Sequence, residues 1–352
     1  MKTIRVCAST EYDVCIEAGL LNRAGSLAAP LVTGRRALIV SDSNVWPLYG
    51  GVLQNSLEQA GFQAGSYVFS AGERSKTPGT LLEVLTLLAQ SEMTRSDPIF
   101  ALGGGVTGDL AGLASALYLR GVPCVQIPTS LLAMVDSSVG GKTAVDLPEG
   151  KNLVGTFTQP RLVLCDPKAL DTLPDVVRAE GWAEIIKYGM LGSRELLEVL
   201  EQGPEHQDIE DIIARCVEMK RDVVARDEQD NDARQILNFG HTIGHAIERC
   251  GGYRFYHGEG VAMGMAIMTR ACVRLGICPP ECGTVLEKLL QMYGLPNTCP
   301  IDEKEILAAA RADKKRRGDS ITLIQPARLG RCVLNRTDYN ALAEVLRVGM
   351  KP

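Results

Sequence analysis

Residues 99–118 read IFALGGGVTGDLAGLASALY, and this stretch decides the class of fold. A short apolar run, Ile99–Leu102, leads into the glycines Gly103–Gly105, and a helical pattern follows at Leu110–Tyr118. Glycines let backbone amides approach a pyrophosphate, and the N-terminus of the following helix favours negative charge. The stretch therefore predicts a strand, a nucleotide-binding turn and a helix. A tight turn without any ligand would need the same glycines, and the acidic residue expected about 20 positions later is absent.

The same alternation continues through the first half of the chain. Short apolar runs alternate with amphipathic stretches such as Leu48–Ala60 and Leu81–Ser91. Strands that alternate with helices through short connections are typical of a parallel α/β sheet. The expected strands are Tyr12–Ile16, Ala37–Ser41, Ser66–Phe69, Ile99–Leu102, Cys124–Ile127 and Leu162–Cys165.

The second half of the chain has a different pattern. Segments with helical periodicity follow one another, and a late pair of runs, Ile321–Ile324 and Cys332–Leu334, predicts a small hairpin. We therefore expect an α/β domain at residues 1–170 and a mainly α-helical domain at residues 171–352. The expected helices are Val176–Met190, Arg194–Glu201, Ile209–Ala225, Thr242–Arg249, Val261–Leu275, Thr284–Tyr293, Glu303–Ala312 and Asp338–Arg347.

Composition excludes several classes of protein. The chain has 352 residues, 45% of them hydrophobic, which excludes intrinsic disorder. Its net charge of −5 argues against a nucleic-acid binder, although a local basic cleft could still bind a small anion. We expect no membrane span, because no run of about 18 apolar residues occurs. Eleven scattered cysteines and the absence of a signal-peptide pattern at Met1–Val6 indicate reduced thiols in a cytoplasmic protein.

The histidines are few and clustered. Three of the four, His241, His245 and His257, lie within 17 positions, and the first two share one face of a helix. Glu184 lies in an otherwise apolar helix, where a carboxylate is costly to bury unless it is paired or binds a metal. Two histidines and one glutamate with an open fourth position are typical of catalytic zinc. The residues alone leave open which of the histidines bind.

Other motifs are weaker. Asp42 follows an expected strand, where it could bind a ribose hydroxyl or only cap a helix. The cysteines of Cys278–Cys282 lack the paired spacing of a structural zinc site, and the acidic run Asp227–Asp232 lacks the glycine of a calcium loop. The basic run Lys314–Arg317 is better interpreted as a solvated turn or an anion contact than as a nucleic-acid site.

Five blocks of the sequence together resemble the 3-dehydroquinate synthase family of sugar-phosphate cyclases, over nearly the whole chain. The resemblance implies an N-terminal Rossmann-like NAD-binding domain, a helical C-terminal domain, a divalent metal (Zn²⁺ or Co²⁺) and a homodimer. The blocks are Leu102–Gly112, Ile127–Thr143, Gly150–Thr156, Ala183–Gly189 and Leu237–Ala246.

The resemblance also implies roles for single residues. Glu184, His241 and His257 would bind the metal, His245 would contact the substrate phosphate, and Arg120 would reach into the site of the partner subunit. The implied NAD contacts are Asp42, Asn44, Glu73, Lys76, Gly104, Gly105, Val106, Asp109, Thr129, Ser130, Lys142, Lys151 and Thr172. The implied substrate contacts are Asp136, Lys142, Asn152, Lys187, Lys220, Arg234, Asn238, His245 and either Lys314 or Lys315, with Lys314 preferred.

The implied reaction converts 3-deoxy-D-arabino-heptulosonate 7-phosphate to 3-dehydroquinate and phosphate, in the shikimate pathway of aromatic amino-acid biosynthesis. It combines a transient oxidation by NAD⁺, phosphate β-elimination, reduction, ring opening and an intramolecular aldol reaction, so NAD is not consumed. A metal-dependent polyol dehydrogenase, a non-catalytic NAD- or metal-binding module and a synthase for an amino-sugar substrate remain alternatives.

Overall fold

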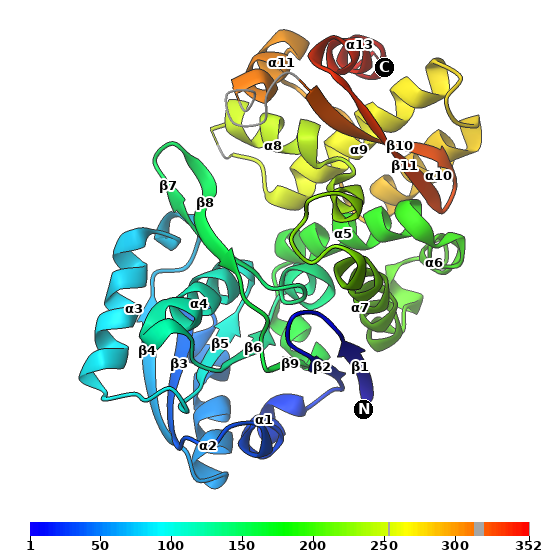
Figure 1. Ribbon diagram of the computed structural model, residues 1–352. Coiled ribbons are helices and arrows are strands. Elements are labelled where there is room, and N and C mark those ends of the chain that lie inside the picture. Colours follow the sequence, from blue (N-terminus) through cyan, green and yellow to red (C-terminus); the bar gives the residue numbers. More distant parts are fainter. Residues whose placement is uncertain (253, 313–319, 352) are drawn as a thin grey trace. The chain divides into compact units, whose positions relative to one another are not determined.

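The computed structural model describes residues 1–252, 254–312 and 320–351, and Figure 1 shows their secondary structure. The chain forms two compact units. Unit 1 contains Met1–Leu173 and Ile209–Gln229, and unit 2 contains Pro174–Asp208 and Asp230–Pro352. The division therefore differs from the expected one at residue 170 in a single helix, α7 (Ile209–Arg226), which packs against strands of unit 1.

Unit 1 is built on a seven-stranded sheet with the order β1-β2-β9-β6-β5-β3-β4. The edge strand β1 runs antiparallel to β2, and all other neighbours are parallel. The six expected strands are confirmed, and β1 was not expected. The strands are β1 (Lys2–Val6), β2 (Tyr12–Ile16), β3 (Arg36–Asp42), β4 (Gln63–Phe69), β5 (Ile99–Gly103), β6 (Cys124–Pro128) and β9 (Leu162–Cys165).

Helices cover both faces of this sheet. Along β3, Ile39 belongs to the core beneath α1 (Ala24–Ala28) and α2 (Gly51–Gln59). Its neighbours Leu38 and Val40 belong to the opposite core. That second core lies beneath α3 (Pro78–Gln90) and α4 (Gly105–Leu117). A parallel sheet with two buried faces is the doubly wound architecture, so the predicted Rossmann-like α/β class is confirmed.

A hairpin that the sequence analysis did not predict lies on α4. It consists of β7 (Lys142–Leu147) and β8 (Gly150–Phe157), which pair antiparallel. The packing is close, because a Cβ atom at Gly112 of α4 would lie 2.4 Å from the Cγ2 atom of Thr143. This glycine therefore allows the hairpin and the helix to touch.

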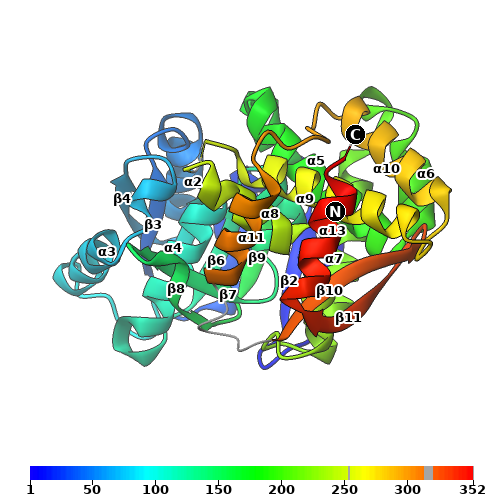
Figure 2. The same ribbon diagram turned by 90° about the horizontal axis from the view of Figure 1, so that it is seen from above.

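Unit 2 is mainly helical and is organised around α9 (His257–Arg274), most of whose residues are buried. Helices α5 (Asp175–Gly192), α8 (His241–Cys250), α10 (Pro280–Met292) and α13 (Tyr339–Gly349) all contact α9. Helix α13 also contacts the hairpin of β10 (Ser320–Arg328) and β11 (Arg331–Asp338), as Figure 2 shows.

The expected helices and the late hairpin of unit 2 are confirmed. The remaining helices of the unit are α6 (Arg194–Leu200) and α11 (Glu303–Ala312). In the part of the chain that the structure describes, no helix combines the length and the apolar character needed to cross a membrane.

Candidate functional site

The glycine turn of unit 1 lies at the topological switch point of the sheet, where the order of successive strands reverses. Strand β4 lies on one side of β3, and β5 and β6 lie on the other. Ligands of such sheets bind at the carboxyl ends of the strands on either side of this point. Ser41 of β3 lies beside Leu102 of β5, so Asp42 and the glycines that follow Leu102 emerge at the same edge. The glycine turn thus lies where a nucleotide is expected to bind.

The turn itself is shorter than the glycine pattern suggests. Helix α4 begins at Gly105, so the expected start at Leu110 was wrong, and the intervening residues form the first helical turn. A Cβ atom at Gly104 would lie 3.3 Å from the Oγ atom of Ser130, which leaves little room for a side chain. The N-terminus of α4 is thereby placed at the edge of the sheet, where its amides favour an anion.

Asp42 caps the turn after β3. Its Oδ1 atom accepts hydrogen bonds from the amides of Asn44 (2.8 Å) and Val45 (3.1 Å). Its other oxygen lies 3.5 Å from the hydroxyl of Thr107 in α4. Asp42 therefore stabilises a turn and does not cap a helix, because the helix Trp46–Gly50 has Val45 at its N-cap and no side-chain cap hydrogen bond. The ribose contact stays a prediction.

A buried lysine joins the hairpin to α4. Lys76 donates to Asp109 Oδ2 (2.6 Å) and to Asn152 Oδ1 (2.5 Å), and its side chain is almost fully buried. Burial lowers the pKa of Lys76, but Asp109 and Glu73 outweigh it and raise the pKa above its ordinary value. The lysine is therefore charged, and it fixes the side chain of Asn152. The backbone amide of Asn152 donates to Asp146 Oδ1 (2.7 Å).

A second buried lysine belongs to unit 1 through α7. Lys220 places its Nζ atom 2.7 Å from Asp136 Oδ1 and 2.7 Å from the backbone oxygen of the same residue. Because α7 packs in unit 1, Lys220 belongs with Asp136 and not with the helical unit to which the sequence assigned it.

The other predicted residues of unit 1 are more dispersed. Lys151 lies 3.8 Å from Glu73, and the hydroxyl of Thr172 lies 2.6 Å from that of Tyr49. Lys142 is exposed at the start of β7, and Arg120 is exposed with a left-handed backbone (φ 66°). Thr129 and Ser130 follow β6, and Val106 lies in the first turn of α4.

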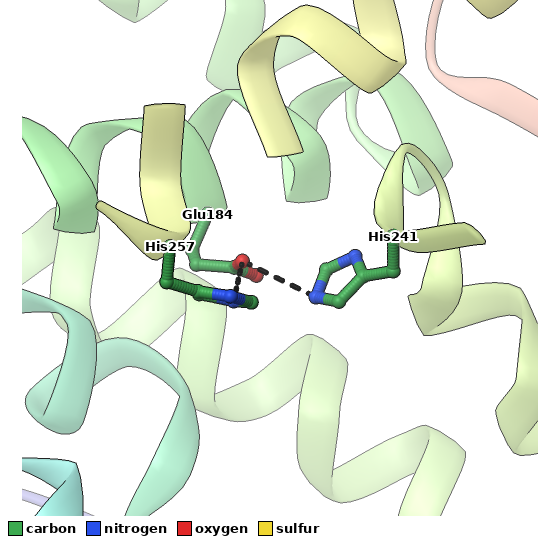
Figure 3. A group of neighbouring side chains, drawn as sticks. All are labelled: Glu184, His241 and His257. Carbon is green, nitrogen blue, oxygen red and sulfur yellow. Dashed lines mark ion pairs between the residues drawn. The ribbon is translucent and has the colours of Figure 1, made fainter. Parts of the chain in front are cut away.

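Three side chains from three helices of unit 2 converge on one point (Figure 3). Glu184 comes from α5, and His241 and His257 are the first residues of α8 and α9. The Nε2 atoms of both histidines lie 3.5 Å from the Oε1 atom of Glu184. The structure therefore brings together the three residues that the resemblance implies as metal ligands.

Glycines bring the two histidine helices close together. A Cβ atom at Gly244 of α8 would lie 2.7 Å from the carbonyl carbon of Gly260 in α9. A Cβ atom at Gly264 would lie 2.0 Å from the backbone oxygen of Gly240. Larger residues at these positions would separate the helices, so the glycines determine the distance between the imidazoles.

Hydrogen bonds orient both imidazole rings. The Nδ1 atom of His241 lies 3.1 Å from the backbone oxygen of Phe239, and that of His257 lies 3.0 Å from Glu248 Oε1. Because both partners are acceptors, each Nδ1 carries a proton, and in the neutral ring each Nε2 carries the lone pair. Two ligands bound to tetrahedral zinc at about 2.1 Å lie about 3.4 Å apart, so the three donors fit such an ion.

Burial and neighbouring charges shift the pKa values of the two histidines in opposite directions. Burial, together with the charge of Lys187, lowers the pKa of His241 to about 3. Burial also lowers the pKa of His257, but Glu184 and Glu248 outweigh it and raise the pKa to about 10. Lys187, itself buried, forms an ion pair with the other oxygen of Glu184. Without a metal, His257 and Lys187 supply positive charge to the carboxylate.

Among the other predicted residues of unit 2, a third histidine lies beside this centre. The ring of His245 lies 5.3 Å from that of His241 and 5.7 Å from that of His257. Arg234 is buried, and Asn238 ends the short helix Ala233–Asn238 just before α8. The predicted Lys314 and its alternative Lys315 lie outside the described residues.

The sequence analysis missed Glu248. It forms a second candidate group of metal ligands with His245 and His257, and it is almost fully buried. Its spacing was the available signal, because it lies three positions after His245 and seven after His241, on the same face of α8.

Comparison with known families and proteins gives a consistent result. Residues 66–179 match the family model described as 3-dehydroquinate synthase N-terminal, and residues 181–316 match the corresponding C-terminal model. A 3-dehydroquinate synthase of Clostridium acetobutylicum is 41% identical over 99% of this chain and 100% of that protein. One from Streptococcus sanguinis is 44% identical over 96% of this chain and 97% of that protein.

Solved structures of related enzymes have the same fold. A 2-deoxy-scyllo-inosose synthase complexed with carbaglucose-6-phosphate, NAD⁺ and Co²⁺ has a TM-score of 0.89 and 26% identity, with 99% of this chain and 100% of that chain covered. A 2-epi-5-epi-valiolone synthase from Streptomyces hygroscopicus with NAD⁺ and Zn²⁺ has a TM-score of 0.88 and 27% identity, with coverage of 99% and 98%. An iron-containing alcohol dehydrogenase, at 16% identity and a TM-score of 0.66, shares the fold alone.

Proposed function

The chain belongs to the 3-dehydroquinate synthase family, and on that premise we propose how its residues carry out the conversion of 3-deoxy-D-arabino-heptulosonate 7-phosphate to 3-dehydroquinate and phosphate. The protein is an enzyme of the phosphorus–oxygen lyase class. The observation that carries the proposal is the convergence of two imidazole Nε2 atoms on one oxygen of Glu184.

In this proposal, unit 2 holds one divalent metal ion, Zn²⁺ or Co²⁺, on Glu184, His241 and His257. Unit 1 holds NAD at the turn between β5 and α4, where helix amides face the pyrophosphate. When bound, the ion supplies Lewis acidity and the dinucleotide supplies reversible hydride acceptance. The residues proposed to contact NAD are those that the resemblance implies, from Asp42 to Thr172.

The protein's cations fit a substrate with a carboxylate and a phosphate. Arg234 suits the planar carboxylate, because guanidinium donates paired hydrogen bonds. Lys187 and Lys220 are held by Glu184 and Asp136, so their ammonium groups are fixed before substrate binds. We assign His245 to the phosphate, together with a lysine at position 314 or 315. Asp136, Lys142, Asn152 and Asn238 complete the proposed substrate contacts.

We also propose a cytoplasmic homodimer in which Arg120 reaches the partner's site. Eleven free cysteines support a reducing compartment. Arg120 is exposed in the turn after α4, as a residue that contacts another subunit must be in the isolated chain.

One assay tests the function. Purified protein with NAD⁺ and Zn²⁺ or Co²⁺ is given the heptulosonate phosphate, and phosphate and NADH are followed together. We expect phosphate release without net NADH, because the hydride returns to the product. Net NADH without phosphate would instead indicate a polyol dehydrogenase, and no turnover on any heptulosonate phosphate would favour a non-catalytic module.

A further inference from the structure

We propose that Glu248 is a positioning residue that orients the metal ligand His257, and that it does not itself bind the metal. The inference deepens the proposed function, because it rests on the metal centre of Glu184, His241 and His257. Glu248 is 2% exposed and lies in α8, while His257 begins α9. The two residues are joined by the 3.0 Å contact between Nδ1 and Oε1.

The contact determines which nitrogen of His257 is available to an ion. A carboxylate only accepts hydrogen bonds, so the ring must donate from Nδ1. In the neutral ring that leaves the lone pair on Nε2, the atom that lies 3.5 Å from Glu184 Oε1. A carboxylate that fixes the tautomer in this way strengthens metal binding without touching the ion.

The alternative is that Glu248, His245 and His257 hold an ion of their own, since these three also form a candidate group. That ion would take the Nδ1 atom of His257 in place of its proton. The ring would then lose the hydrogen bond that sets Nε2 toward Glu184. The two groups therefore compete for one imidazole, and the geometry favours the group with His241, whose own Nδ1 is bonded to a backbone oxygen.

The backbone of His257 is anchored separately. Burial raises the pKa of the half-buried Glu180, and the charge of His257 and the backbone amides of Gly258 and His257 lower it, so this carboxylate lies beside the start of α9. A Cβ atom at Gly258 would lie 2.4 Å from the Cα atom of Glu180, so the helix start is packed against α5. With the backbone held, the remaining freedom of His257 is rotation of its ring, and Glu248 is the side chain that restricts it.

The experiment measures zinc affinity of the full chain, stripped of metal and titrated with Zn²⁺ in competition with a chromophoric chelator. Wild type is compared with E248Q, E248A and the control E287Q. The control alters another glutamate of unit 2, Glu287. Its Oε1 atom lies 2.6 Å from the Nε atom of Arg270, so it pairs with a residue outside the metal centre. Thermal unfolding and circular dichroism show whether each variant is folded.

We expect one Zn²⁺ per chain in every folded variant, with affinity lowered about 10-fold in E248Q and up to about 100-fold in E248A. The amide oxygen of glutamine can still accept from Nδ1, whereas alanine leaves the ring unrestrained. If E248A does not fold, E248Q carries the test. E287Q should bind like wild type. The visible absorption of bound Co²⁺ should change in E248A, because that spectrum reports ligand geometry.

Two results would overturn the proposal. Wild-type affinity in both Glu248 variants would mean that the contact does not position His257. Because the two groups share His257, zinc affinity that is kept in H241A and lost in folded E248Q would make Glu248 a ligand. A separate arm tests the premise with E184Q and H257A: if neither lowers zinc affinity, the metal centre itself is wrong and the positioning role falls with it.

Discussion

Each unit of the molecule contains a buried charged cluster, and the two clusters differ in what completes them. In unit 1, Lys76 is surrounded by oxygen acceptors from Asp109 and Asn152, so its charge is balanced within the protein. In unit 2, the Nε2 atoms of His241 and His257 both face the carboxylate of Glu184. Without a metal, protonated His257 and Lys187 balance this carboxylate. Once His257 loses its proton, both Nε2 atoms carry lone pairs, and a metal ion can take the place of that proton. The comparison therefore distinguishes a structural ion pair from a set of metal ligands.

The largest expected effect comes from removing a proposed metal ligand of unit 2. Glu184→Ala or His257→Ala should abolish metal binding and lower the rate of phosphate release by more than about 100-fold, which exceeds the effect of losing a supporting residue. His245→Ala should impair turnover but retain the metal. Metal content and phosphate release measured on the same samples decide the matter, and equal metal loss in all three variants would favour a three-histidine site.

The next test compares the two lysines directly. Lys187→Met leaves the carboxylate of Glu184 buried without its ammonium partner and should cost about 3–5 kcal/mol of unfolding free energy without metal. Lys76→Met likewise leaves the carboxylate of Asp109 without its ammonium partner, and it should lower the unfolding free energy by about 1–3 kcal/mol. Saturating Zn²⁺ should rescue the first variant and not the second, because only Glu184 gains a new cation. Urea unfolding with and without Zn²⁺ measures both, and equal rescue would contradict the distinction.

A smaller effect tests the packing that holds the cluster of unit 1. Gly112→Ala would place a methyl group 2.4 Å from Thr143 and should destabilise the protein by about 1–3 kcal/mol. Gly51→Ala in α2 is the matched control, because no atom lies within 4 Å of its Cβ position, and it should be neutral or stabilising by up to about 1 kcal/mol. Thermal unfolding should separate the two; equal melting temperatures would show that the hairpin can move away from α4.

The smallest expected effect is the number of protons released when zinc binds. Glu184 and Glu248 outweigh burial and raise the pKa of His257 to about 10, whereas burial lowers the pKa of His241 to about 3. Zinc binding at pH 8 should therefore release about one proton, from His257 alone, and zinc affinity should rise with pH up to about 10. Calorimetry in buffers of different ionisation enthalpy measures this release, and a count of two or none would contradict the assigned protonation.

The same pKa values give the sign of the stability change without metal. The raised pKa of His257 favours the protonated form in the folded state. Its contribution to stability is complete below the ordinary value of 6.5 and is lost as the pH rises through about 10. Denaturant unfolding of the metal-free protein at pH 6, 8 and 10 should show this loss, and bound zinc should abolish it.

Local patterns predicted the elements well and their starting points less well. The strands of the sheet and the helices of unit 2 follow from periodicity, which depends on neighbours two to four positions apart. Helix α4 begins at Gly105, and α9 begins at His257, earlier than the patterns indicated. Glycine and histidine are poor helix formers, so packing decided these first turns. The hairpin β7–β8 was missed because its strands carry the glycines and lysines of two motifs.

The sequence by itself determined that this chain has an α/β part and a helical part, that a glycine turn follows a strand, and that three histidines lie close together along the chain while a glutamate lies in an apolar helix. Only the tertiary structure decided that α7 and Lys220 belong to unit 1, that both Nε2 atoms face Glu184, and that Glu248 supports His257. These features depend on contacts between helices far apart in the chain. Periodicity records which face of a helix is buried, but it contains no information about which distant helix covers that face.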